Sequence, residues 1–473
     1  MRVPVSSLDR FMKSVSRILG LGAALAVLAA PIVRAQEVSA WPTWRGMSGT
    51  GVAPGAQPPT TWGDQQNIKW KAKIPGGGFS TPIVWKDRIF LLTAIETAEE
   101  RSVAAAAPAS SEPTNVTQPK DGKRGGARKG GGGFGGGSVP TKVHEFAVIA
   151  VDRRSGKIAW QKIARKEVPH EGHHPSHGYA SASPVTDGER LYVSFGSRGF
   201  YCYDLQGNLH WEKDLGDMQS RGGFGEGASP ALAGNLLIIP WDHEGQSFIV
   251  ALDKKTGAEV WRTNRDERSS WSTPLIVEFE GRLQAIVPAS NRTRSYDAAT
   301  GKLIWEASGL TGNVIPMPVA GHGMVYVMSG FQGNSIQAIK LSSRGDVSGT
   351  GNIVWSTRRS APYVPSPVLS GDLLYMSKSN DAYLSCLNAQ SGETFYQDQA
   401  LTGMRGIYAS PLAANGYLYV VGREGMVMVL KDAPKFEIVA TNTLSDKIDA
   451  SPVMLEKELF LRGHEYLYCI TEG

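Results

Sequence analysis

Short apolar runs recur along the chain, and most are followed by a glycine-containing turn and then by an aromatic residue. The stretch Phe248–Trp261 is a clear example, with an apolar run up to Leu252, a turn from Asp253 to Gly257 and a second run that ends in Trp261. Glycine provides the positive φ that a tight hairpin needs, and aspartate can accept hydrogen bonds from the amides of the turn. The pattern predicts two antiparallel strands joined by a hairpin.

This unit repeats, and the aromatic residue stands four positions after the turn glycine at Trp160, Trp211, Trp261, Trp305, Trp355 and Tyr396. A proline, usually preceded by serine or threonine, comes before each unit at Pro82, Pro184, Pro230, Pro274, Pro318, Pro367, Pro411 and Pro452. The first two prolines are 102 residues apart, and the later spacings lie between 41 and 49 residues. A period in the mid-forties with four strands per repeat is typical of propeller blades. The sequence therefore predicts an all-β fold, an eight-bladed β-propeller of four-stranded antiparallel blades.

The two ends of the repeat region complete each other. Asn67–Lys71 has the pattern of the end of a unit, with Trp70 at the aromatic position, whereas Tyr466–Gly473 has the pattern of a beginning. Pairing these segments would close the ring without an open sheet edge. We therefore expect residues 67–473 to form the propeller and the N-terminal strand to complete blade eight.

The segments outside the repeats have different compositions. Residues 1–35 combine basic residues, a short apolar run and a small-residue cleavage motif ending at Ala35, and they predict a signal peptide whether Met1 or Met12 is the start. We expect a periplasmic or secreted protein without a membrane span after cleavage. Residues 36–66 predict an irregular lead-in. Residues 95–142 are rich in alanine and glycine and predict a disordered insertion in blade one.

The net charge and the positions of the cysteines indicate which partners and bonds to expect. The net charge is +5, but the predicted signal peptide carries most of the excess, so a nucleic-acid partner is not expected. Cys202, Cys386 and Cys469 occupy the strand position at which other repeats have Ala150 or Ala251. We expect three buried, separate thiols in a monomer.

The connector of residues 161–182 contains four histidines within eight positions, which are His170, His173, His174 and His177. Clustered imidazoles suit Zn²⁺ or Cu²⁺, so a metal site is one interpretation. The other interpretation, a polar loop, is favoured because no carboxylate or thiol spacing indicates a known coordination geometry.

One face of the predicted propeller has more charge than the other. Successive turns alternate between the two ends of a blade, which places the connectors before each proline on the same face as the turns between second and third strands. The candidate ligand-binding residues on this charged face are Arg198, Arg221, Glu226, Asp242, His243, Glu244, Asn291, Arg292, Arg405, Arg423 and Arg462. Arginines from several blades around one axis would suit a carboxylate or phosphate, and we expect these side chains to converge near the axis.

The repeat Asp-x-x-Thr/Ser-Gly-x-x-x-Trp resembles that of the quinoprotein dehydrogenase superfamily and its PQQ-like propeller relatives. The resemblance covers roughly residues 62–473, and it implies that the tryptophans dock neighbouring blades. The segment Trp41–Gly46 is similar to one in uncharacterised exported propellers of this kind. Non-catalytic relatives share the repeat, among them the lipoprotein of the outer-membrane β-barrel assembly machinery.

Catalytic members of that superfamily bind PQQ against a vicinal cysteine pair and hold Ca²⁺ with a glutamate, an asparagine and an aspartate. This sequence has no adjacent cysteines, and Glu226, Asn291 and Asp242 are candidates that do not align with the calcium motif. Two hypotheses follow. The favoured one is an exported scaffold that binds a small anionic ligand or a periplasmic protein without chemistry, and the alternative is a PQQ- and Ca²⁺-dependent oxidoreductase acting on alcohols or sugars. Whether the protein is an enzyme stays open.

Overall fold

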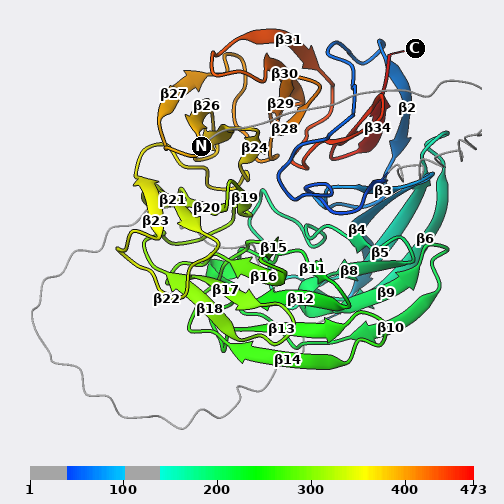
Figure 1. Cartoon of the computed structure of the whole chain (residues 1–473). Coiled ribbons are helices and arrows are strands. Elements are labelled where there is room, and N and C mark those ends of the chain that lie inside the picture. Colours follow the sequence, from blue (N-terminus) through cyan, green and yellow to red (C-terminus); the bar gives the residue numbers. More distant parts are fainter. Residues whose placement is uncertain (1–39, 102–138, 473) are drawn as a thin grey trace, which may run out of the picture. The chain divides into compact units, whose positions relative to one another are not determined.

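Residues 40–101 and 139–472 are described by the computed structural model, and they form eight sheets arranged around one axis (Figure 1). The sheets are antiparallel except for one short parallel pairing in the fourth blade, and the described residues include two single-turn helices, η1 (Gly196–Arg198) and η2 (Arg221–Gly223). The predicted all-β, eight-bladed propeller is confirmed. In this part of the chain, no helix has the length and apolar character needed to cross a membrane.

The first four blades follow the chain in order. Blade one contains β1 (Ala40–Trp41), β3 (Ile83–Trp85), β4 (Arg88–Glu100), β5 (Lys142–Asp152) and β6 (Ile158–Glu167). Blade two contains β7 (Val185–Thr186), β8 (Arg190–Ser194), β9 (Phe200–Asp204) and β10 (Leu209–Lys213). Blade three contains β11 (Ala231–Ala233), β12 (Leu236–Trp241), β13 (Phe248–Asp253) and β14 (Glu259–Asn264). Blade four contains β15 (Leu275–Phe279), β16 (Arg282–Val287), β17 (Thr293–Asp297), β18 (Leu303–Ala307) and β22 (Gly345–Asp346).

The other four blades complete the ring. Blade five contains β19 (Val319–Gly321), β20 (Met324–Ser329), β21 (Ser335–Lys340) and β23 (Ile353–Thr357). Blade six contains β24 (Val368–Ser370), β25 (Leu373–Lys378), β26 (Asp381–Asn388) and β27 (Thr394–Ala400). Blade seven contains β28 (Leu412–Ala414), β29 (Tyr417–Val421), β30 (Met426–Lys431) and β31 (Ile438–Thr443). Blade eight contains β32 (Val453–Leu455), β33 (Glu458–Arg462), β34 (Tyr466–Ile470) and β2 (Ile68–Lys73).

Blade eight is completed by the N-terminal strand, as the sequence predicted. β2 pairs antiparallel with β34, with Trp70 opposite Cys469 and Lys73 opposite Tyr466. This pairing gives β34 a partner on both sides, since β33 lies on its other edge. The ring is therefore closed by segments from opposite ends of the propeller sequence.

The repeated tryptophan and glycine contact each other across blade boundaries. An indole ring from one blade packs against the turn glycine of the next, in the pairs Trp70–Gly156, Trp160–Gly207, Trp211–Gly257, Trp261–Gly301 and Trp355–Gly392. Each of these indoles also donates Nε1–H to a backbone carbonyl of that next blade, at 2.8 to 3.1 Å. The two sequence markers of the repeat are therefore the two halves of one inter-blade contact.

The cysteines lie opposite aromatic residues within their own blades. Cys202 pairs with Trp211, and Cys386 pairs with Tyr396. All three cysteines are buried free thiols, as predicted, and burial raises the pKa of Cys202 to about 11 and that of Cys386 to about 12. A small side chain at this position leaves room for the aromatic ring beside it.

The predicted insertion boundaries in blade one need correction. β4 continues to Glu100 and β5 begins at Lys142, so residues 95–100 and 142 belong to strands. Glu96 pairs with His144 and Glu100 with Lys142, because the segment 95–100 alternates in polarity and extends the hairpin. Residues 102–138 of the predicted disordered insertion lie outside the described residues, as does the predicted signal peptide.

The lead-in runs across the innermost strands of several blades. β1 pairs with β3 in blade one, and Ala53 donates its amide to the carbonyl of Ala413 in blade seven at 2.8 Å. Between these points, the buried guanidinium of Arg45 donates to the carbonyls of Pro367 and Pro411, at 2.6 and 2.8 Å. Most of the lead-in has no regular secondary structure, and it positions the neighbouring Trp44 at the axis.

Candidate functional site

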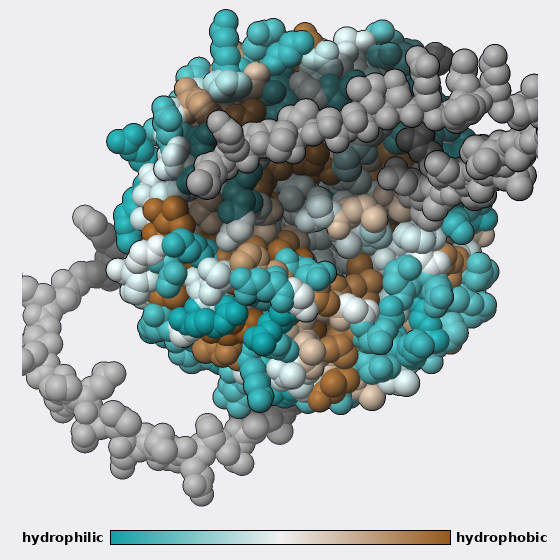
Figure 2. Space-filling view, in the orientation of Figure 1, coloured by the Kyte–Doolittle hydropathy of each residue, from teal (hydrophilic) through white to brown (hydrophobic). Residues whose placement is uncertain are grey.

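A cavity of about 740 Å³ lies at the propeller axis, and we call it the axial cavity. Its wall includes the residues that precede the innermost strands. Seven of these residues carry hydroxyl groups, and they are Thr81, Ser183, Ser229, Thr273, Ser366, Ser410 and Ser451. In the view of Figure 2, hydrophilic residues cover much of the outer rim, and apolar residues appear around the hollowed middle.

The seven hydroxyls join the blades around the axis. The amide of Thr81 donates to the Ser183 hydroxyl at 2.9 Å, and the Ser183 amide donates to the Ser229 hydroxyl at 2.9 Å. The same bond links the further blade pairs at 2.9 to 3.1 Å, except between blades four and five, where blade five has Met317 at this position. Each hydroxyl oxygen accepts a hydrogen bond from a backbone amide, and its own proton stays free for donation. The cavity wall can therefore donate hydrogen bonds to a ligand.

Aromatic rings form much of the remaining wall. They come from the lead-in, from connectors and from blade turns, and they are Trp44, Phe79, Phe224, Trp271, Phe331, Tyr363 and Tyr408. The rings of Phe331 and Tyr363 are stacked with centroids 5.0 Å apart, and the Trp271 indole is held by a 2.7 Å hydrogen bond to Gly225 O. Flat apolar surfaces beside hydroxyl donors suit a planar ligand with polar substituents.

The carboxylate in the wall of the axial cavity already has partners within the protein. Asp449 receives two hydrogen bonds from Arg423, at 2.6 and 3.1 Å, and its Oδ2 lies 3.0 Å from Nε2 of His464. Burial alone would raise the pKa of Asp449, but the hydrogen bonds from His464 and Arg423 hold it below its usual range. This carboxylate is therefore already compensated.

Arg221 is the one arginine or lysine among the described residues of the cavity wall. Its Nη1 donates to Oδ1 of the buried Asn313 at 3.2 Å, and the part of the chain that the structure describes contains no ion pair of Arg221 with a carboxylate. The Asn313 amide nitrogen lies 3.4 Å from the Tyr363 hydroxyl, which orients the amide oxygen toward the guanidinium. Arg221 can therefore bind an anionic group of a ligand.

Two of the predicted metal candidates, His174 and His177, line the axial cavity instead. Nδ1 of His174 lies 2.7 Å from the Ser176 hydroxyl, and Nε2 of His177 lies 2.9 Å from the carbonyl of Glu226. Burial lowers the pKa of His177 to about 4 and also lowers that of His174. These imidazoles are therefore neutral near pH 7 and add polarity to the wall without adding charge. His173 packs edge-on against Tyr179, with centroids 4.5 Å apart.

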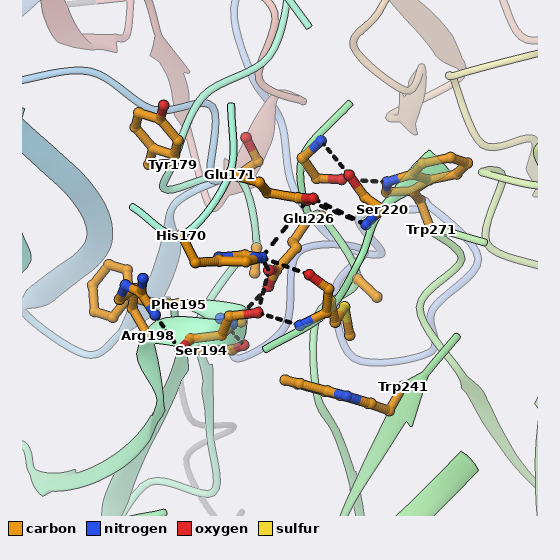
Figure 3. A pocket seen from close by; sticks show the side chains of 18 of the residues that line it. His170, Glu171, Tyr179, Ser194, Phe195, Arg198, Ser220, Glu226, Trp241 and Trp271 are labelled. Atoms are coloured by element: carbon orange, nitrogen blue, oxygen red, sulfur yellow. Dashed lines mark hydrogen bonds and ion pairs between the residues drawn. The ribbon is translucent and has the colours of Figure 1, made fainter. Parts of the chain in front are cut away.

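A smaller pocket of about 60 Å³ adjoins the axial cavity, and we call it the side pocket (Figure 3). His170, Glu171 and Glu226 meet there, and this is the one group of three or more potential metal ligands among the described residues. Nε2 of His170 lies 3.5 Å from Glu226 Oε1 and 3.9 Å from Glu171 Oε1. The sequence interpretation included His170 and Glu226 in separate proposals and missed Glu171, although it directly follows His170.

Two other predicted residues line the side pocket but are committed to internal contacts. Arg198 donates to the carbonyl of Val168 at 3.0 and 3.1 Å and pairs with Asp217 at 2.9 Å. Asp242 forms a buried two-bond ion pair with Arg265, at 2.7 and 3.0 Å. Both side chains therefore shape the pocket, and their charges are compensated.

The other predicted binding residues line neither the axial cavity nor the side pocket. The eleven predicted side chains therefore do not converge near the axis. His243 accepts the Gln219 amide at 3.1 Å, and Glu244 accepts the Ser269 hydroxyl at 3.0 Å. Arg292 pairs with Glu306 and Asp346, while Asn291 bonds to the Asp266 carbonyl. Arg405 is exposed. Arg462 is buried against Ser80, and its burial lowers its pKa to about 9. Most of these groups form hydrogen bonds or ion pairs that hold neighbouring turns in place. Their positions in the sequence do not distinguish this role from ligand binding.

The donor groups of the axial cavity do not fit PQQ held together with Ca²⁺. Ca²⁺ prefers six to eight oxygen ligands that include carboxylates. Asp449 is the one carboxylate among the described residues of the wall, and it is held by Arg423 and His464. Glu226, Asn291 and Asp242, the candidate calcium ligands, have separate partners and form no common group. The three cysteines lie in different blades, so none can form a vicinal pair.

The chain matches the family model described as outer membrane protein assembly factor BamB over residues 144–398 and 245–470. Tetrathionate hydrolase from Acidithiobacillus ferrooxidans is 22% identical over 310 residues, which are 60% of this chain and 55% of that protein. The match thus spans about half the length of this curated relative.

Solved structures show the same fold at low sequence identity. Quinohemoprotein alcohol dehydrogenase from Comamonas testosteroni superposes with a TM-score of 0.57 at 10% identity, covering 92% of this chain and 80% of the other. BamB from Moraxella catarrhalis superposes with a TM-score of 0.51 at 16% identity, covering 68% of this chain and 91% of the other. These neighbours include both an enzyme and an assembly factor, and they show the fold alone.

Proposed function

Since the chain belongs to the PQQ-like β-propeller family, we propose that it is an exported propeller that binds a small anionic ligand in its axial cavity. Catalysis is not part of the proposal. The observation that carries it is the Arg221 guanidinium, which lies in the cavity wall with the Asn313 amide as its side-chain partner. Export agrees with the match to an outer membrane protein assembly factor and with the composition of residues 1–35.

The shape and the donors of the cavity favour a small molecule over a protein surface. A volume of about 740 Å³ lies in the range of pockets that enclose a drug-sized ligand. The wall combines the seven hydroxyl groups that precede the innermost strands with seven aromatic rings, so a planar ligand could stack on the rings and accept hydrogen bonds. Arg221 would then fix the position of its carboxylate or other oxyanion.

Tryptophan fluorescence offers a direct test, because Trp44 and Trp271 lie in the cavity wall. The protein would be titrated with two anionic probes, PQQ without added Ca²⁺ and tetrathionate, the latter suggested by the name of the curated relative. If a probe binds, Arg221→Ala should weaken its binding roughly tenfold or more, because a hydrogen bond to a charged group contributes about 1.5–3 kcal/mol.

Arg405→Ala is the matched control, since Arg405 is an exposed arginine outside the cavity wall. Loss of binding in the Arg221 variant, with binding retained in the Arg405 variant, would support the axial cavity. Equal losses in both variants would indicate non-specific attraction of anions and would contradict the proposal. Failure of both probes would reject these two compounds, and a screen of other planar carboxylates would follow.

A further inference from the structure

The side pocket brings together three side chains from two connectors. His170 and Glu171 lie between β6 and β7, and Glu226 lies between η2 and β11. In Figure 3, the His170 ring points toward the Glu226 carboxylate, and Glu171 lies beside both. One ligand atom from each residue can be chosen so that all lie within 4.8 Å of one another.

Backbone and hydroxyl groups hold these side chains in place. Glu226 accepts the Ser197 amide at 2.7 Å and the Ser197 hydroxyl at 2.5 Å, from the short helix η1. Glu171 accepts the Ser220 amide at 3.1 and 3.3 Å, and His170 Nε2 lies 2.6 Å from the Met218 carbonyl. The three ligands are therefore oriented by contacts from other segments, which is how a preorganised metal site is built.

The charge of the site is not balanced by a cationic side chain. Among the ion pairs of the described residues, Glu171 and Glu226 contact His170 alone, and Arg198 is occupied by Val168 and Asp217. The side chains of His170, Glu171 and Glu226 are 17%, 19% and 15% exposed. The largely buried site offers the two negative carboxylates little solvation, which makes their charge costly. A bound cation would remove this cost.

The spacing of the ligand atoms suits a small ion. Metal–ligand distances near 2.0–2.2 Å in a tetrahedral site separate the ligand atoms by roughly 3.4 Å. The distances from His170 Nε2 to the two carboxylates, 3.5 and 3.9 Å, are close to this value. Ca²⁺, with oxygen ligands at 2.3–2.6 Å and a higher coordination number, fits less well.

We propose that His170, Glu171 and Glu226 bind one divalent transition-metal ion in the side pocket, with Zn²⁺ or Mn²⁺ as the best fit. An imidazole nitrogen with two carboxylates is a donor set that these ions accept. Binding requires the His170 tautomer with its proton on Nδ1, so the hydrogen bond from Nε2 to the Met218 carbonyl is given up.

The ion would link the connector between β6 and β7 to the connector between η2 and β11, and both connectors also line the axial cavity. His177, on the same connector as His170, bonds to the Glu226 carbonyl at 2.9 Å, and Trp271 bonds to Gly225 next to Glu226. The ion is therefore expected to stabilise this wall of the cavity. Metal binding can be measured without any cavity ligand, so its test is independent of the proposed function.

Calorimetric titration of the chelator-treated, untagged protein tests the proposal. Zn²⁺ should bind with a stoichiometry of one, more tightly than Ca²⁺, and should raise the melting temperature. His170→Ala and Glu171→Gln should each weaken Zn²⁺ binding about tenfold or more and reduce the thermal shift. Glu171→Gln is the gentler change, because the Ser220 amide can still donate to the remaining side-chain oxygen.

His173→Ala is the matched control, since His173 lies on the same connector but outside the ligand group. Circular dichroism would verify that each variant is folded. Unchanged Zn²⁺ affinity in both the His170 and Glu171 variants would overturn the proposal. Loss of binding in the His173 variant instead would place the ion elsewhere in the histidine-rich connector and would also overturn it.

Discussion

Trp261 and Gly301 lie so close together that a Cβ atom added at Gly301 would be 2.4 Å from Cε3 of the indole ring. Trp261 ends the repeat unit of blade three, and Gly301 is in the last hairpin of blade four. The same indole donates Nε1–H to Ala298 O at 3.0 Å. One ring therefore fills the space above a neighbouring turn and satisfies one of its carbonyls.

We expect Gly301→Ala to destabilise the propeller by about 2–4 kcal/mol. The new methyl group must displace the Trp261 ring, and the alanine backbone must keep the positive φ of the glycine. Gly281→Ala is the control, because Gly281 has a φ of +72° and no atom within 4 Å of its added Cβ. Chemical denaturation of both variants would separate the backbone cost from the clash. Equal destabilisation would show that the Trp261 contact adds nothing.

Trp305 and Trp261 should differ in their contribution to stability. Trp305 is fully buried, whereas Trp261 is partly exposed. Trp305→Ala is expected to cost about 3–5 kcal/mol and Trp261→Ala somewhat less, because the lost apolar contact scales with burial. Melting temperatures would rank the two variants. A Trp261→Ala protein with an unchanged melting temperature would contradict the docking role of the repeat tryptophans.

Removal of β2 should open the ring. A protein that begins at Gly76 loses the strand that pairs with β34, which exposes an unpaired edge, and we expect aggregation or failure to fold. A protein that begins at Asn67 keeps β2 and loses the lead-in with Arg45, so it separates the two contributions. Analytical ultracentrifugation and circular dichroism would compare them. A monomeric, β-rich protein that begins at Gly76 would refute closure by β2 as a requirement for folding.

The part of the blade-one insertion that lies between the ends of β4 and β5 should not be needed for folding. The amide of Arg101 donates to Thr141 O at 3.0 Å, so the two strands are still adjacent at this point. Replacing residues 102–138 by a short glycine–serine linker should leave the melting temperature nearly unchanged, because loop length has a small effect on closure entropy. Deleting 97–140 instead removes paired strand residues and should destabilise the blade.

Stability should depend on the protonation of His177. Its pKa is about 4 in the folded protein because of burial, against about 6.5 in an unfolded chain. The unfolded chain therefore takes up the proton first as the pH falls from about 6.5 to about 4, and the folded state loses up to about 3 kcal/mol of stability over that range.

Urea denaturation at pH 7.5 and pH 5.0 would test this dependence. The wild-type protein should lose roughly 2 kcal/mol more between these pH values than His177→Gln, which cannot take up the proton. His210→Gln, with an exposed histidine on β10, is the control and should behave as the wild type. A wild-type loss equal to that of the His177 variant would show that this imidazole does not control the pH response.

The sequence by itself determined the blade count, the closing strand and the environment of the cysteines. These features depend on a short repeat, in which Trp261 stands four residues after Gly257 and Cys202 occupies the place of Ala251. Spacing within one strand or hairpin fixes which face a side chain takes, so local order is enough. Even the Ser/Thr–Pro pairs that form the hydroxyl ring were visible, although their pattern served only to count blades.

The candidate sites were decided by the tertiary structure. Arg221, Arg292 and Arg462 were all assigned to the same predicted face, yet one lies in the cavity wall, one pairs with carboxylates and one is buried beside a backbone carbonyl. Likewise, His170 meets Glu226 only because two irregular connectors fold over η1. Connectors follow no period, and their paths depend on contacts between residues distant in the chain, so no spacing rule reveals which charged groups meet.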